Sequence, residues 1–191
     1  MVISNYDNFT SDGTNNKPFV PFQEEFLFDV DLGSSSGSVS ANLPQGVVGR
    51  CGNYFTRTTD GKVVTLIGTS NLARIYYLNS NNEFEENFVS LDEEAGSRVE
   101  FIYRFNNGLI VGVSKANGFA KIFMSTNGAS FSPVATLDSN GVSHPHYNSN
   151  TRKLYFGTYR ISSSESTGSL YSFDGTNLER SISNIDNGRI S

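Results

Sequence analysis

Apolar residues occur in short runs that are typical of β-strands. These runs are rich in Val, Ile, Phe and Tyr and are bounded by clusters of Asn, Gly, Ser and Asp. No long window has the spacing of an amphipathic helix, which leaves one short helical turn expected at 90–95, after a serine that can cap it. The pattern predicts an all-β fold. Its clearest strands are 63–67, 73–78, 101–103, 109–111, 121–124, 154–156 and 169–171.

Two series of turns recur along the chain with nearly constant spacing. The first series contains Asp60, Asn107 and Thr151. The second contains Asn81, Asn127 and Asp174. Within each series, successive members lie 44 to 47 residues apart. A strand ending in glycine follows each turn of the first series, so strands recur together with turns.

The spacing divides the chain into four units that form a single domain, residues 1–191. We expect these repeats at about 1–47, 48–95, 96–141 and 142–191. Each unit holds two hairpins and therefore four antiparallel strands. This predicts a propeller-like array of about four blades, either a closed four-bladed ring or part of a larger propeller. A β-sandwich is the alternative, because its evenly spaced hairpins would mimic such a period.

Two seven-residue turns, 125–131 and 172–178, follow the pattern Ser-x-Asp/Asn-Gly-x-x-apolar. They resemble the Asp-box, or BNR, turn of a large group of β-propellers, although neither ends in Trp. The turn depends on an Asp or Asn that accepts backbone N–H bonds and on a Gly with positive φ. Its role is therefore structural. The expected turn residues are Asp60, Asn81, Asn127, Gly128, Asp174 and Gly175.

Charge and composition exclude several classes of partner. Fourteen basic and nineteen acidic side chains give a net charge of −5, which disfavours nucleic acid as the main partner. The single cysteine, Cys51, cannot form an internal disulfide or a thiolate zinc site. His144 and His146 lack an identifiable third ligand, so we predict no metal and no cofactor. The first residues lack a Sec-type signal, and no apolar run is long enough for membrane insertion, which predicts a soluble protein.

The candidate ligand-binding residues are aromatic or basic. Tyrosine rings can stack on sugars, and arginines placed on the channel-lining strand of a propeller can hold an anionic group. Core packing of the tyrosines, and salt bridges from the arginines to acids such as Glu100, are the alternatives. The candidates are Tyr76, Tyr77, Tyr103, Tyr159, Arg57, Arg104 and Arg160. We expect Arg57 and Arg104 to occupy equivalent places in their units.

Three functions compete. The first is a non-enzymatic structural or binding module that contacts other protein chains, as in a bacteriophage tail, which would place it in the virion. The second is a lectin-like propeller that binds glycans. The third follows from the Asp-box resemblance, since that group includes sialidases, and residues 159–162 match three letters of their Tyr/Phe-Arg-Ile-Pro motif at Arg160. That match lies in the last unit and lacks the proline, so we assign no catalytic residue.

Overall fold

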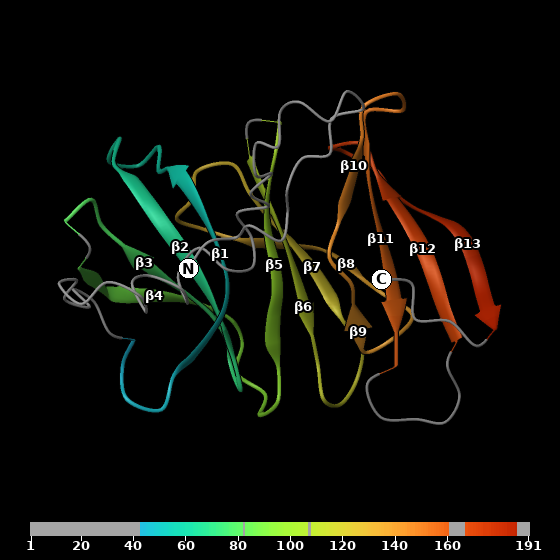
Figure 1. Ribbon diagram of the computed structural model, residues 1–191, viewed down its shortest axis with the longest axis horizontal. Helices are drawn as coiled ribbons and strands as arrows, with labels where there is room; N and C mark the ends of the chain where they lie inside the picture. Colours follow the sequence, from blue (N-terminus) through green and yellow to red (C-terminus); the bar gives the residue numbers. More distant parts are fainter. Residues whose placement is uncertain (1–42, 82, 107, 161–166, 187–191) are drawn as a thin grey trace, which may run out of the picture.

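The computed structural model describes residues 43–81, 83–106, 108–160 and 167–186. In these residues, strands form three antiparallel sheets, none of which closes on itself (Figure 1). Sheet I contains β1 (Val48–Thr56), β2 (Val63–Ser70), β3 (Ala73–Leu78) and β4 (Phe84–Asp92). Sheet II contains β5 (Arg98–Phe105), β6 (Gly108–Ser114), β7 (Lys121–Ser125) and β8 (Ser132–Thr136). Sheet III contains β9 (Gly141–Val142), β10 (His146–Asn148), β11 (Lys153–Tyr159), β12 (Thr167–Phe173) and β13 (Leu178–Asp186).

The all-β prediction is confirmed, and every apolar run singled out above lies within a strand. The helical turn expected at 90–95 is wrong. Strand β4 continues to Asp92, whose side chain accepts the Glu94 N–H at 3.0 Å and closes a turn there instead of starting a helix. The described residues contain no helix, and hence none that could span a bilayer. The first predicted unit, with the exception of 43–47, lies outside the described residues.

Each sheet is a meander in which strands pair in chain order. In sheet III, two short strands, β9 and β10, take the place of a single first strand, and both pair with β11. The ladder is interrupted between them at Ser143, whose N–H donates to the Gly157 carbonyl while its hydroxyl accepts the Gly157 N–H, both at 2.8 Å. Pro145, which has no N–H to donate, follows in the same gap.

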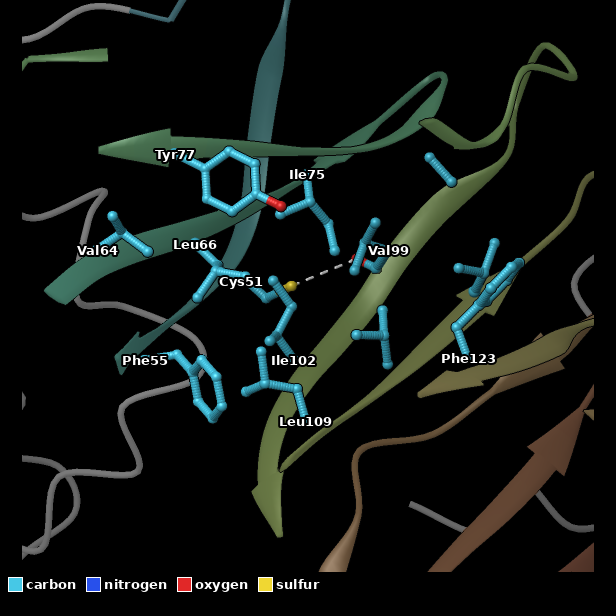
Figure 2. Packing of buried hydrophobic residues seen from close by; sticks show 13 residues of the cluster. Cys51, Phe55, Val64, Leu66, Ile75, Tyr77, Val99, Ile102, Leu109 and Phe123 are labelled. Carbon is cyan, nitrogen blue, oxygen red and sulfur yellow. Dashed lines mark hydrogen bonds between the residues drawn. The ribbon is translucent and has the colours of Figure 1, made fainter. Parts of the chain in front are cut away.

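The sheets pack face to face. One core, drawn in Figure 2, lies between sheets I and II and includes Leu66 and Ile75 on one side and Val99, Ile102 and Val111 on the other. A second core lies between sheets II and III. Its members include Phe101, Ile110, Ile122, Phe156 and Tyr171. Sheet II therefore buries both faces, which explains why all of β6 is buried.

The three sheets share a common register. The second strand of each contains a glycine, Gly68, Gly112 or Gly157, and each glycine pairs with an apolar residue of the third strand. In sheets I and II, the first strand carries a bulge beside this glycine. At Gly112 an added Cβ would lie 2.2 Å from Phe101 Cε1, so a larger residue would displace this ring of the second core.

Candidate functional site

One exposed position of the first strand is repeated across the three sheets. Tyr54 pairs with Thr65, Arg104 with Leu109, and Tyr147 with Leu154. These three partners are equivalent, because each lies three residues before the common glycine. Tyr54, Arg104 and Tyr147 therefore occupy matching places in β1, β5 and β10. We call this set the first-strand row.

Local packing positions the first-strand row. The Asn53 side chain donates to the Ile102 carbonyl at 2.9 Å and so fixes β1 against β5. The Arg104 guanidinium carbon lies 5.7 Å from the centre of the Tyr54 ring, a cation–π distance. The Tyr147 ring meets the buried Phe105 ring edge-on, with centroids 5.9 Å apart. Two aromatic rings and one guanidinium thus lie along neighbouring first strands.

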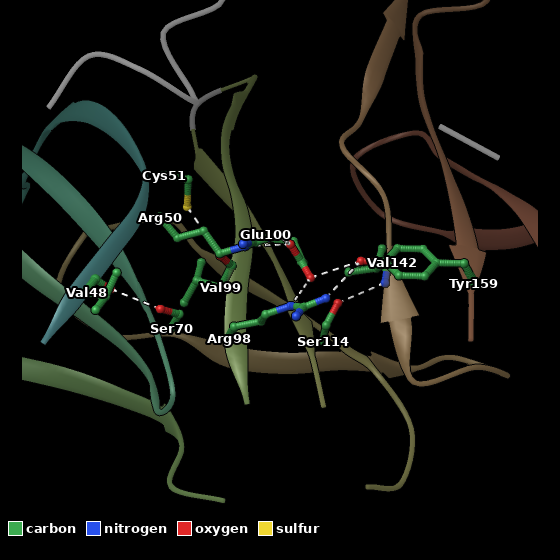
Figure 3. A network of polar contacts seen from close by, with 10 residues as sticks. All are labelled: Val48, Arg50, Cys51, Ser70, Arg98, Val99, Glu100, Ser114, Val142 and Tyr159. Atoms are coloured by element: carbon green, nitrogen blue, oxygen red, sulfur yellow. Dashed lines mark hydrogen bonds and ion pairs between the residues drawn. The ribbon is translucent and has the colours of Figure 1, made fainter. Parts of the chain in front are cut away.

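A second polar cluster joins the first strands of sheets I and II to sheet III, as Figure 3 shows. Glu100 is its centre: Arg50 Nε donates to it at 2.7 Å, Arg98 Nε at 2.6 Å and Tyr159 Oη at 3.1 Å. The Glu100 side chain is only 6% exposed. Arg50 and Arg98 are therefore both paired with this acid.

The Glu100 carboxyl is ionised at neutral pH. Burial raises its pKa, but the hydrogen bond from Arg98 and the charge of Arg50 outweigh burial, so the pKa lies below its ordinary value. The pKa of Arg98 is raised, because its bonds to Glu100 outweigh its burial. Such a cluster ties the three sheets together.

Arg57 is also neutralised. It follows the end of β1 and pairs with Asp60 and, at 2.7 Å, with Glu85. Its bond to Asp60 lowers the pKa of that exposed carboxyl to about 2. Its guanidinium carbon lies 5.2 Å from the ring centre of Tyr77. Burial raises the pKa of Tyr77 to about 12.

The remaining candidates from the sequence are scattered over the fold. Tyr76 is buried against Phe84 and Phe88, and Tyr103 is partly buried. Tyr159 belongs to the Glu100 cluster, and Arg160 is exposed just after β11. Arg57 and Arg104 are not equivalent, because register matches Arg104 to Tyr54 and places Arg57 beyond the strand. Sequence reasoning missed Tyr54 and Tyr147, which only the strand register identifies.

The turns contain the hydrogen bonds that their sequence pattern predicts. Asn127 Oδ1 accepts the Ala129 and Ser130 N–H groups, each at 2.9 Å. Asp174 Oδ1 accepts the Thr176 and Asn177 N–H groups at 2.8 and 2.7 Å. Asp60 Oδ1 accepts the Lys62 N–H at 3.1 Å. Asn81 differs, since it donates its N–H to Asn79 Oδ1, and Asn79 is the acceptor of that turn.

Both Asp-box-like turns dock on the preceding sheet. Gly128 has a φ of 72°, and an added Cβ would lie 2.6 Å from the Phe55 ring of sheet I. Gly175 has a φ of 106°, and its Cβ would lie 2.7 Å from Asn106 Nδ2 in the β5–β6 turn of sheet II. Glycine is needed at these two turns both for positive φ and for close approach.

An aspartate at or just after the last strand of sheets I and II makes polar contacts with the next sheet. Asp92, at the end of β4, accepts Lys115 Nζ at 3.0 Å and Lys121 Nζ at 3.4 Å. Asp138, which follows β8, accepts hydroxyl bonds from Thr158 at 3.0 Å and from Ser169. The two aspartates therefore make equivalent links from one sheet to the next.

No group of three or more His, Cys, Asp or Glu among the described residues could hold a metal ion. His144 is partly buried with its ring 6.0 Å from that of Phe101, whereas His146 is exposed.

Comparisons with known proteins assign no family. No family model matches the chain, and neither the curated proteins nor the solved structures give a significant match.

Proposed function

We propose that this chain is a non-enzymatic binding module of the β-propeller type, whose sheets are blades that also contact other protein chains. The supporting observation is that sheet I packs on sheet II in the same register in which sheet II packs on sheet III. Leu66 and Ile75 of sheet I occupy the places of Ile110 and Ile122 of sheet II, and both pairs are buried against the following sheet. Repeated packing of this kind is the basis of propellers and other repeat arrays.

The same register defines the two outer faces of the array. On sheet I, Ile67 and Tyr76 occupy the places through which Val111 and Phe123 contact the preceding sheet. Within the chain itself they are already buried in a third cluster, against which Leu43, Val47 and Phe84 pack. On sheet III, Leu170 occupies the place of Ile122, and Ile182 opposite it is 51% exposed. The face of sheet III that carries Leu170 and Ile182 is our proposed contact for another sheet of the same kind.

As the partner we propose a second copy of the chain, which would pack on that face of sheet III. Contacts between identical chains form closed dimers, rings or extended assemblies. An assembly of several chains, such as a bacteriophage tail, is the proposed setting. A sialidase site is less well supported, because Arg57 and Arg104 lie near the β1–β2 and β5–β6 hairpins whereas Arg160 follows the far end of β11.

Native mass measurement tests the proposal. The wild-type chain should form particles with a multiple of the monomer mass, and Ile182→Lys should shift them toward monomer, because it places a charge in the contact. Val134→Lys is the matched control, since Val134 is a similarly exposed apolar residue on β8 of sheet II. A wild-type monomer at tens of micromolar, or an unchanged mass for Ile182→Lys, would contradict assembly through sheet III.

A further inference from the structure

The first-strand row combines exposed aromatic surface with its repeated position. Tyr54 is 42% exposed and Tyr147 is 40% exposed, although both lie in strands of packed sheets. A tyrosine ring offers an apolar face for the C–H surface of a sugar, and its hydroxyl offers a hydrogen bond. Two such rings, separated by one sheet, match a ligand that is itself a chain of similar units.

Arg104, between the two tyrosines, differs from the neighbouring arginines. Arg50, Arg57 and Arg98 all pair with carboxylates. For Arg104, the described part of the chain supplies no carboxylate within ion-pair distance, and its contact is the Tyr54 ring. Its side chain is exposed. A guanidinium in this setting is suited to a carboxylate from outside the chain, which it can bind through two parallel N–H bonds.

The charge balance favours an acidic sugar over a nucleic acid. Single-stranded nucleic acid also stacks on aromatic rings, but its binding depends on several cations along the phosphate backbone. The row carries one arginine on a chain of net charge −5. One carboxylate per few sugar units fits this single cation, whereas a phosphate at every unit would not.

We propose that the first-strand row of Tyr54, Arg104 and Tyr147 binds an acidic oligosaccharide, with sugar rings against the two tyrosines and a carboxylate on Arg104. This inference deepens the proposed binding function by naming a ligand class. It does not require the contact on sheet III, so the monomer-forming variant Ile182→Lys should still bind the sugar. Loss of assembly and loss of sugar binding are therefore distinguishable.

Calorimetric titration with a sparsely de-esterified oligogalacturonate, in which only a few units carry a free carboxylate, tests the proposal, and its fully methyl-esterified form serves as the matched ligand. The two ligands share their sugar rings, but only the first carries carboxylates. The acid form should bind at least about tenfold more tightly, which corresponds to one charge-assisted hydrogen-bonded contact. Arg104→Gln should weaken binding of the acid form about tenfold, leaving the ester unaffected, and Arg104→Lys should restore part of the loss.

The tyrosines are tested by the same titration. Tyr54→Ala and Tyr147→Ala should each weaken binding of both ligands about fivefold or more, because the stacking surface is lost. Tyr147→Phe, which keeps the ring, should retain most of the binding. Phe119→Ala is the control, because Phe119 is an exposed aromatic in the β6–β7 loop, away from the row. The proposal is overturned by absence of binding, by unchanged binding in the row variants, or by tighter binding of an oligothymidylate.

Discussion

At the scale of single residues, Glu100 shows how the fold uses charge. Its buried carboxylate accepts bonds from two arginines on different sheets and from Tyr159. The arginines remain partly exposed, at 40% and 28%, so water can compensate part of any lost contact. The buried Glu100 carboxylate has no such access to water. Removing it should cost more than removing an exposed acid of a surface ion pair.

We predict that Glu100→Gln lowers the free energy of unfolding by about 2 to 3 kcal/mol, because two arginines then lose the charge that neutralises them. Glu179→Gln is the control. Glu179 pairs with Lys153 at 3.1 Å but is 62% exposed, and its loss should cost less than about 0.5 kcal/mol. Urea unfolding of the two variants measures the difference. Equal effects would mean that Glu100 contributes no more than a surface pair.

Stability should also depend on pH through Glu100 and Asp92. Burial raises the pKa of Asp92, but its bonds from Glu94 N–H and from Lys115 outweigh burial, so both carboxyls have lowered pKa values in the folded chain. A group of this kind stabilises the fold above its unfolded pKa, and the contribution is lost as pH falls through the folded value.

Accordingly, the free energy of unfolding should decrease as pH falls below the ordinary values of 4.5 for Glu100 and 3.8 for Asp92. Urea unfolding between neutral pH and about pH 3 measures this slope. In Glu100→Gln the slope should be shallower, because one of the linked protons is no longer taken up. A slope equal to that of the wild type would show that the Glu100 carboxyl is not linked to folding.

At the scale of elements, two turns of similar sequence use different residues. Asn127 supplies the side-chain acceptor of its turn, whereas Asn81 contributes its backbone N–H to Asn79 Oδ1. We predict that Asn127→Ala costs about 1 kcal/mol of unfolding free energy, since two N–H groups lose their acceptor. Asn81→Ala should cost less than about 0.5 kcal/mol. Thermal or urea unfolding of the pair tests this, and a larger loss for Asn81→Ala would contradict the assignment.

The strands that the sequence predicted most clearly are those that the fold buries most. β2, β3, β6, β7, β11 and β12 lie inside their sheets, where contacts on both sides favour continuous apolar runs. β5 is an outer strand, but its Phe101 and Ile102 are buried in the cores on the two faces of sheet II. β4 and β8 are outer strands in which every residue is exposed or only partly buried, which weakens the apolar signal. Period and turn chemistry were still enough to expect four strands in each unit.

The first-strand row was not predictable from spacing alone. Tyr54 and Arg104 are 50 residues apart, whereas their partners Thr65 and Leu109 are 44 apart. The turn between the first and second strands is longer in sheet I than in sheet II, which accounts for the difference. A constant spacing of 47 residues therefore matched Arg104 to Arg57 instead of Tyr54. The positions of the bulges and the pairing partners are three-dimensional information, and they determine which side chains share a place.

At the scale of the whole molecule, each sheet is stabilised by its neighbours. Phe156 and Tyr171 of sheet III have parallel rings with centroids 5.9 Å apart and belong to the core shared with sheet II, where Phe156 also meets Phe101. Sheet I contacts sheet II through a separate core. In an array held by contacts between neighbours, damage to one contact should loosen the sheet beyond it before it loosens the rest.

We therefore predict that Phe156→Ala costs about 3 to 5 kcal/mol of unfolding free energy, because it leaves a cavity in the core between sheets II and III. Hydrogen exchange should show that β11 and β12 lose amide protection first, while β2 and β3 in sheet I stay protected. Phe119→Ala, which truncates a side chain that is 56% exposed, should change neither quantity. If protection instead fell equally in all three sheets, the chain would unfold as one cooperative unit, and the contacts between sheets would be strong enough to make the three cores behave as one.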